Sequence, residues 1–152
     1  MPVIALEDLP DGPLIALDPG SKTIGVAACG ASRGLSTPVE TIRRTKFTAD
    51  ADRVFALYDE RKAAGIVMGL PVNMDGSEGA RAQSARALAR NLMRLRDIPV
   101  VFQDERLSTF EAEEKLIAAG MRREKRREII DAHAAANILQ SALDRLAQLD
   151  KG

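Results

Sequence analysis

The sequence has few cysteine and aromatic residues. A single cysteine, Cys29, excludes an internal disulfide bond and a zinc site built from several cysteines. Tryptophan is absent, and one tyrosine and four phenylalanines are present among 152 residues. The core must therefore be built from Ala, Leu, Ile and Val, and few rings are available to stack on nucleic-acid bases.

Long apolar runs are also missing. No run approaches the length of a membrane span, and the N-terminal residues lack the basic start and the cleavage site of a signal peptide. We therefore expect a cytoplasmic protein that does not enter a membrane. A length of 152 residues suits one compact domain. The expected domain covers residues 1–152, with loose termini at residues 1–12 and 150–152.

Neither sign of charge dominates, because 22 Lys and Arg residues balance 22 Asp and Glu residues. On that count alone, nucleic acid is not the first partner to consider. The balance hides a basic run formed by Arg122, Arg123, Lys125, Arg126 and Arg127. Such a run is more often a solvated loop than a nucleic-acid contact. Its closeness in sequence to the acidic Asp131 gives more weight to a nucleic-acid contact.

Apolar runs and hydrophobic periodicity predict alternating strands and helices. The predicted strands cover residues 14–17, 23–29, 38–42, 66–69 and 99–102, and the predicted helices cover residues 49–64, 80–96, 108–120 and about 129–149. The first two strands are joined by a short turn and must be antiparallel, whereas strands that alternate with helices imply parallel crossovers. The predicted architecture is an α/β fold whose five-stranded mixed sheet is covered by helices on both faces.

Acidic residues follow two of these strands, and another lies near the start of the last predicted helix. Asp18 ends a buried strand, the pair Asp104 and Glu105 follows another strand, and Asp131 shares the apolar face of the last helix. Ligand sites of α/β sheets lie beyond the carboxyl ends of the strands. Converging carboxylates without a His or Cys cluster suit Mg²⁺ or Mn²⁺, and such sites support phosphoryl chemistry.

Each carboxylate also has a simpler interpretation. Asp18 is about as well explained as a cap of the turn that follows it. Asp104 taken alone is better explained as a loop residue, and Glu105 as a partner for Arg106. The helix dipole favours Asp131 near a helix N-terminus without any catalytic role. The joint placement of these residues, rather than any one of them, indicates a metal site.

Four segments resemble motifs of the YqgF/RuvX family of pre-16S ribosomal RNA nucleases and Holliday-junction-resolvase-like proteins. They are Leu17–Ala27 (LDPGSKTIGVA), Gly69–Gly76 (GLPVNMDG), Asp104–Thr109 (DERLST) and Asp131–Gln140 (DAHAAANILQ). The segments occur in the family's order across residues 14–140. The resemblance implies a ribonuclease-H-like fold with strand order 3-2-1-4-5. It also implies a catalytic, metal-binding triad of Asp18, Glu105 and Asp131, with Asp104 as a fourth candidate ligand.

Two features depart from related proteins. Many resolvases of this fold carry their second acid after the fourth strand, but here that strand ends in Gly69, Leu70 and Pro71, so the acid must come from the fifth strand. Family members often carry an aromatic residue in the following helix, where Leu88 or Leu92 takes its place. We interpret this second change as a substitution within the core.

The resemblance implies a metal-dependent nuclease that hydrolyses phosphodiester bonds in the 5′-end maturation of pre-16S ribosomal RNA. A monomer and a homodimer are both open, since a four-way junction is two-fold symmetric and would suit a homodimer. Mg²⁺ or Mn²⁺ would be held by the carboxylates, with Asp18 bridging. The residues expected to contact nucleic acid are Lys22, Asn73, Arg106, Arg122, Arg123, Lys125, Arg126 and Arg127. The alternatives are a resolvase of four-way DNA and a non-catalytic assembly factor that binds ribosomal RNA. An actin-like ATPase fits poorly, because 152 residues supply one lobe and that family needs two.

Overall fold

A computed structural model describes the backbone of residues 4–104 and 123–151, and the side chains of residues 4–104 and 133–149. The strands are β1 (Leu14–Pro19), β2 (Thr23–Cys29), β3 (Thr37–Arg43), β4 (Gly65–Leu70) and β5 (Val100–Asp104). The helices are the 3₁₀ turn η1 (Leu6–Asp8), α1 (Phe47–Glu60), α2 (Ala80–Leu95) and α4 (Arg123–Lys151). The predicted helix over residues 108–120 lies outside the described residues.

The five strands form one mixed sheet in the order β3-β2-β1-β4-β5. β1 pairs antiparallel with β2, and β2 pairs antiparallel with β3. β4 lies parallel to both β1 and β5, because a helix connects β3 to β4 and another connects β4 to β5. The predicted strand order and the predicted mixture of directions are confirmed.

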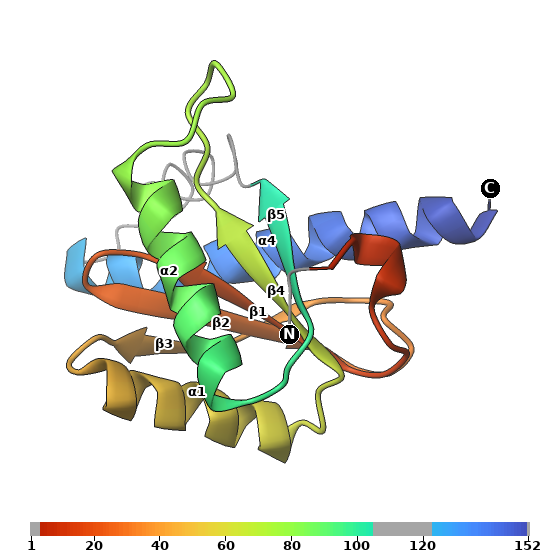
Figure 1. The fold of residues 1–152 in the computed structure, drawn as a ribbon, viewed down its shortest axis with the longest axis horizontal. Helices are drawn as coiled ribbons and strands as arrows, with labels where there is room; N and C mark the ends of the chain where they lie inside the picture. The colour runs from red at the N-terminus through yellow and green to blue at the C-terminus, as the bar shows by residue number, and fades with distance from the viewer. Residues whose placement is uncertain (1–3, 105–122, 152) are drawn as a thin grey trace.

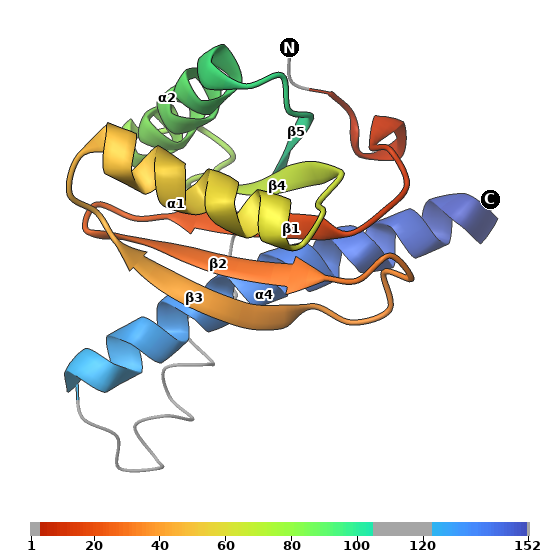
Figure 2. The ribbon, with the colours of Figure 1, turned by 90° about the horizontal axis from the view of Figure 1, so that it is seen from below.

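Helices cover both faces of this sheet. α1 and α2 lie on one face, and α4 crosses the other (Figures 1 and 2). Side chains alternate along each strand, so Ile15 and Leu17 of β1 pack towards α1 and α2, whereas Leu14 and Ala16 pack towards α4. The same alternation decides on which face each functional side chain of the sheet lies.

The core is aliphatic, as the composition predicts. Leu88 and Leu92 of α2 are buried in it, which confirms that they belong to the core. Cys29 is buried on the α4 side, and this burial raises the pKa of its thiol. Within the described part of the chain, no helix is long and apolar enough to span a bilayer.

The last helix starts earlier than the sequence predicts. α4 begins at Arg123 instead of about residue 129, so Arg123, Lys125, Arg126 and Arg127 occupy its first turns instead of a loop. Arg, Lys and Glu are all good helix formers, and no Gly or Pro interrupts them. The helix therefore extends into a segment whose sequence lacks the apolar stripe by which a helix is usually predicted.

Residues 4–12 are anchored, although the sequence predicts a loose terminus over residues 1–12, of which residues 1–3 lie outside the described residues. Leu6 and Leu9 are buried in the core between the sheet and α4. The Ile4 N–H donates a hydrogen bond to the carbonyl of Val100 at 3.1 Å. Leu9 lies so close to Gly65 that a Cβ there would come within 2.6 Å of the Leu9 Cδ2 atom. A side chain at position 65 would therefore force the Leu9 side chain to shift.

Candidate active site at the carboxyl edge of the sheet

Asp18 lies near the end of β1, the central strand of the sheet. It pairs with Gly25 of β2 and shares the α4 face with Leu14 and Ala16. The residue is half-buried and takes part in a polar interaction. Its Oδ1 atom is nevertheless buried without a hydrogen-bond donor in the described part of the protein. The carboxylate thus has an inward-facing oxygen on the face that α4 covers.

Gln103 of β5 lies in the same row of the sheet as Asp18. The pairing of Leu17 with Met68 brings Asp18 level with Gly69, and Gly69 pairs with Gln103. Gln103 is on the α4 face, because Val101 two residues earlier packs in the core on that side. Its Oε1 atom is also buried without a hydrogen-bond donor among the described residues. Two buried side-chain oxygens therefore flank a glycine, which has no side chain to separate them.

Asp104 lies at the same edge but on the other face. It follows Gln103 and pairs with Leu70, and its face is shared with Phe102, which packs in the core on the α1 and α2 side. Asp104 is exposed, whereas Asp18 is half-buried. Alternation along β5 therefore separates the Asp104 side chain from that of Asp18.

The turn that follows Asp18 is fixed by Arg44. The Gly20 N–H donates to the carbonyl of Thr23 at 2.8 Å and closes the turn. Arg44 donates from Nη1 to the carbonyl of Gly20 at 2.7 Å and from its backbone N–H to the carbonyl of Lys22 at 2.8 Å. The backbone around Lys22 is thereby held in place, while the Lys22 side chain is exposed.

Arg44 is in turn supported by Asp50 at the start of α1. Asp50 is only 4% exposed and is the one buried charged side chain in the described part of the chain. Its Oδ1 accepts a hydrogen bond from the Thr45 N–H at 3.2 Å, and its Oδ2 lies 4.0 Å from the Arg44 Nε. A buried carboxylate paired with a cation costs less free energy than an unpaired one. Asp50 therefore positions the arginine that fixes the turn beside Asp18.

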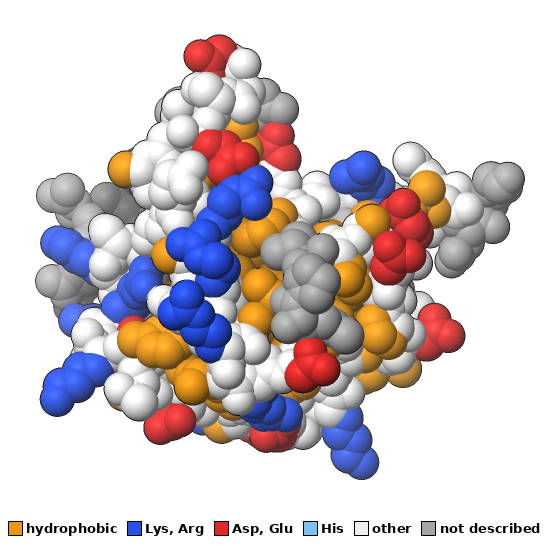
Figure 3. Space-filling view, viewed as in Figure 1, with side chains coloured by type: hydrophobic (Ala, Val, Ile, Leu, Met, Phe, Trp, Pro, Cys, Tyr) orange, Lys and Arg blue, Asp and Glu red, His pale blue; other side chains and the backbone are white. Residues whose placement is uncertain are grey.

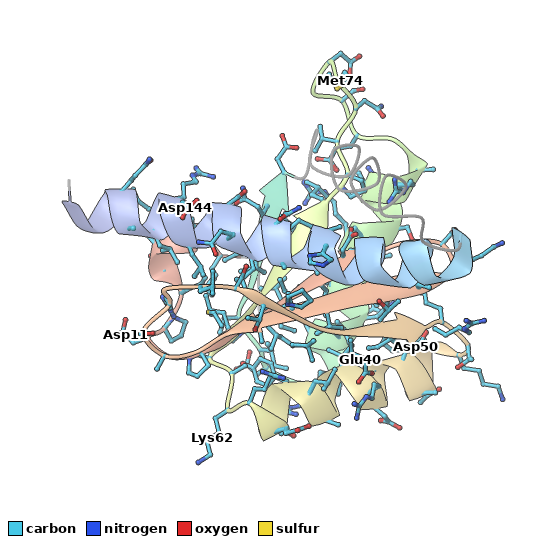
Figure 4. The ribbon with its side chains drawn as sticks, turned by 180° about the vertical axis from the view of Figure 1, so that it is seen from behind. Asp11, Glu40, Asp50, Lys62, Met74 and Asp144 are labelled. Atoms are coloured by element: carbon cyan, nitrogen blue, oxygen red, sulfur yellow. The ribbon has the colours of Figure 1, made fainter. Side chains whose placement is uncertain are left out.

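The loop of residues 71–79 projects beyond this edge, with Met74 at its tip (Figure 4). The Asn73 side chain donates to the Ser77 hydroxyl at 3.0 Å, and the Asn73 N–H donates to the Ser77 carbonyl at 2.8 Å. Asp75 accepts a hydrogen bond from the Ser77 hydroxyl, which lowers the pKa of its carboxyl group. Gly76 has a φ of 89°, which side chains disfavour. The loop is therefore a compact hairpin held by its own polar groups.

The loop is tied to α2 and β5 through Arg86. Glu78 and Arg86 form a two-pronged ion pair with N–O distances of 2.6 and 2.7 Å. The hydrogen bond from Arg86 lowers the pKa of Glu78. The Arg86 guanidinium also lies 4.8 Å above the ring of Phe102. One arginine thus connects three elements at this edge.

The structure brings only some of the predicted site residues together. Asp18, Lys22, Asn73 and Asp104 all lie at or beyond the carboxyl edge, although Asp104 is on the opposite face from Asp18. Asp131 and the basic residues 123–127 lie in α4, which begins on the side of the molecule where β1 ends (Figures 1 and 2). Glu105, Arg106 and Arg122 lie outside the described residues. Within the described portion, no three His, Cys, Asp or Glu side chains are grouped closely enough to hold a metal.

Gln103 and Arg44 lie at the candidate site, although the sequence does not identify them. Gln103 carries a weak sequence signal, since a polar amide follows the apolar run of β5. Its position beside Asp18 in the sheet, however, depends on the register of two strand pairs. Arg44 carries no signal, because its contact with Gly20 joins residues that only the folded sheet brings together.

Replacement of Gln103 by methionine should stabilise the protein in the absence of divalent cations. A buried polar atom without a partner costs about 1–3 kcal/mol, and methionine has a similar shape without that oxygen. We expect a gain of about 1 kcal/mol in the free energy of unfolding, measured by urea denaturation in EDTA. The matched control is Gln83→Met at an exposed position of α2, where we expect no gain. A loss of stability in Gln103→Met would contradict this account of the amide.

Comparisons with known proteins agree with the fold and the motifs. A family model described as RuvX, Holliday junction resolvase, matches residues 12–145. A protein of Rhodopseudomonas palustris (strain BisA53), named "Putative pre-16S rRNA nuclease", is 59% identical over 142 residues, which cover 93% of this chain and 87% of the relative. A protein of Nitrobacter hamburgensis with the same name is 59% identical over 138 residues, with 91% and 85% covered.

Two solved structures have the same fold. One is Thermus thermophilus RuvC in complex with a Holliday junction substrate, with a TM-score of 0.52, 11% identity, and coverage of 90% of this chain and 96% of that chain. The other is a Thermus thermophilus RuvC structure, with a TM-score of 0.52, 13% identity, and coverage of 91% and 96%. This likeness shows a ribonuclease-H-like fold, as the sequence motifs imply. The match of the family model over residues 12–145, together with the identity to the curated relatives, shows that the chain belongs to the RuvX family.

Proposed function

We propose that this protein is a divalent-metal-dependent nuclease that hydrolyses phosphodiester bonds in precursor 16S ribosomal RNA during maturation of its 5′ end, and that it acts in the cytoplasm. The observation that carries the proposal is the placement of Asp18 on the central strand, at the edge of the sheet where α/β proteins bind ligands. Family membership supports a nuclease reaction, and the names of the curated relatives support precursor 16S ribosomal RNA as its substrate.

The oxygen atoms at this edge fit a hard cation. Mg²⁺ and Mn²⁺ prefer carboxylate and amide oxygens, and both Asp18 and Gln103 direct a buried oxygen to the α4 face. We propose that Asp18, Glu105 and Asp131 are the acidic ligands and that Gln103 directs its amide oxygen to the same site. Asp104 is the weaker candidate, because its side chain lies on the opposite face from Asp18.

Each group of residues has a separate task in this proposal. A bound cation would make water a better nucleophile and would stabilise the charge on the leaving oxygen. Asp18 would hold its carboxylate in one position, because Arg44 and Asp50 fix the turn that follows it. Lys22, Asn73, Arg106 and the basic run of residues 122–127 would bind backbone phosphates, whose contacts position a substrate without reading its sequence.

The test is a cleavage assay on a panel of end-labelled substrates. The panel contains a precursor 16S 5′-end fragment, unstructured RNA, and a four-way DNA junction. We expect cleavage of the precursor fragment with Mg²⁺ or Mn²⁺ and none in EDTA. Cleavage of the DNA junction alone would instead favour a resolvase, which is how the matching family model is described. Binding of RNA without cleavage of any substrate would contradict the proposal and favour an assembly factor.

A further inference from the structure

α2 has a strongly one-sided charge in a chain whose charges balance. Its sixteen residues include four arginines, which are Arg81, Arg86, Arg90 and Arg94, and no Asp or Glu. The whole chain, in contrast, carries 22 basic and 22 acidic residues. The balanced total therefore hides a local excess of positive charge on this helix.

Three of these arginines form a row along the outer face of α2. Arg86, Arg90 and Arg94 are spaced by four residues, which places them on one face at intervals of about 6 Å. The opposite side of the helix is buried against the sheet through Ala85, Leu88 and Leu92. Figure 3 shows a column of Lys and Arg side chains over α2. The row is therefore a continuous basic surface rather than a set of scattered charges.

Arg90 and Arg94 are available to a ligand. Both are exposed, and neither makes an ion pair or a hydrogen bond through its side chain in the described part of the protein. Arg86 differs, because Glu78 and the ring of Phe102 hold its guanidinium in place. The row thus consists of one fixed arginine beside the loop of residues 71–79 and two arginines whose charge no described residue neutralises.

The row starts near the candidate active site. α2 follows the loop that leaves the carboxyl end of β4, so its first turn lies at the edge where β1 ends, close to Asp18. The helix then runs towards the edge where β5 begins, and Arg94 lies about 21 Å along the axis from the first residue of α2. A strand that extends from the site edge can follow this row.

The character of the face favours nucleic acid over a protein partner. Protein interfaces have an apolar or aromatic centre, and on α2 the one strongly exposed large apolar residue is Leu95, at its end. Evenly spaced arginines suit the repeated phosphates of a nucleic-acid backbone, which they bind without reading bases.

We propose that the outer face of α2 is a phosphate-binding surface for the nucleic-acid substrate, with Arg90 and Arg94 contacting the backbone and Arg86 fixing the end of the row beside the site. This inference rests on the proposed nuclease function, and it adds a surface on the face of the sheet opposite to α4.

The test compares Arg90→Gln/Arg94→Gln with the matched control Arg61→Gln/Lys62→Gln. The control removes two exposed charges at the end of α1, and Lys62 lies at the opposite end of the molecule from Met74 (Figure 4). The probe is a fluorescein-labelled RNA stem-loop with a single-stranded extension, and its affinity is measured by anisotropy between about 50 and 200 mM salt. We expect about 10-fold weaker binding for the α2 variant at the lower salt, and a plot of log K against log salt that is shallower by about 1.5–2.

Three outcomes separate this inference from the proposed function. An unchanged affinity and salt slope in Arg90→Gln/Arg94→Gln would overturn the inference, as would an equal loss in the control. Binding that weakens only in the α2 variant supports the surface, even if no protein in the series cleaves RNA, in which case the proposed function fails alone. Because both arginines are exposed, circular dichroism and the melting temperature should match the wild type.

Discussion

Asp18→Asn protein is expected to lose about 10³-fold in the rate of cleavage. Coordination of a cation at a reacting phosphate contributes several kcal/mol to transition-state stabilisation, and each 1.36 kcal/mol corresponds to a tenfold change in rate. Asparagine keeps the shape of the side chain but removes the negative charge that a divalent cation requires. The loss should therefore appear in kcat, measured under single-turnover conditions with saturating Mg²⁺.

The same substitution should leave the fold and the binding of RNA intact. The Oδ1 atom of Asp18 accepts no hydrogen bond from the described residues, so the amide breaks no contact at that atom. The matched control is Asp11→Asn, because Asp11 is an exposed acid before the opposite end of the same strand. We expect wild-type cleavage from this control. Cleavage by Asp18→Asn protein at the wild-type rate would show that the active site lies elsewhere.

Leu139→Ala is expected to destabilise the protein by about 2–5 kcal/mol. Leu139 lies in the middle of α4, is completely buried, and packs with Leu14, Val67 and Val101 of the sheet. Removal of a buried leucine side chain loses its transfer free energy and leaves a cavity. α4 also carries Asp131 and the basic residues from 123 to 127, so this contact holds two groups of the proposed site against the sheet.

The control for this substitution lies in the same helix. Leu149 is 49% exposed, and Leu149→Ala should change the free energy of unfolding by less than about 0.5 kcal/mol. Urea unfolding of both variants, with a shared m-value, gives the comparison. A loss below about 1 kcal/mol for Leu139→Ala would show that α4 is not fixed to the sheet as described.

The β1–β2 hairpin and the mixture of strand directions are readable from the sequence because they depend on local signals, whereas the strand order is implied by the family resemblance. The apolar run from Leu14 to Leu17 and the turn at Pro19 and Gly20 specify the hairpin, and alternation of later strands with helices specifies the parallel pairs. The start of α4 is not readable in this way. Residues 123–128 are all charged, so they contribute no apolar stripe, although their helix propensity is high.

The candidate site is only partly readable from the sequence. Asp18 is identifiable because it follows a buried strand. The role of Gln103 depends on the register of β4 against both β1 and β5, and the role of Arg44 depends on a contact with Gly20 across the fold. The assignment of Asp104 to the opposite face likewise needs the observed extent of β5, which continues two residues beyond the predicted strand end at residue 102.

The most direct test of the account is an anomalous difference map from crystals of the wild-type protein soaked with Mn²⁺. We expect a cation on the α4 face of the carboxyl edge, bonded to the Asp18 carboxylate within about 2.5 Å and lying on the Gln103 side of it. Crystals of Asp18→Asn protein under the same soak should lose this peak. A map with Mn²⁺ bound elsewhere and none at Asp18, or a peak that persists unchanged in the variant, would contradict the metal-dependent site.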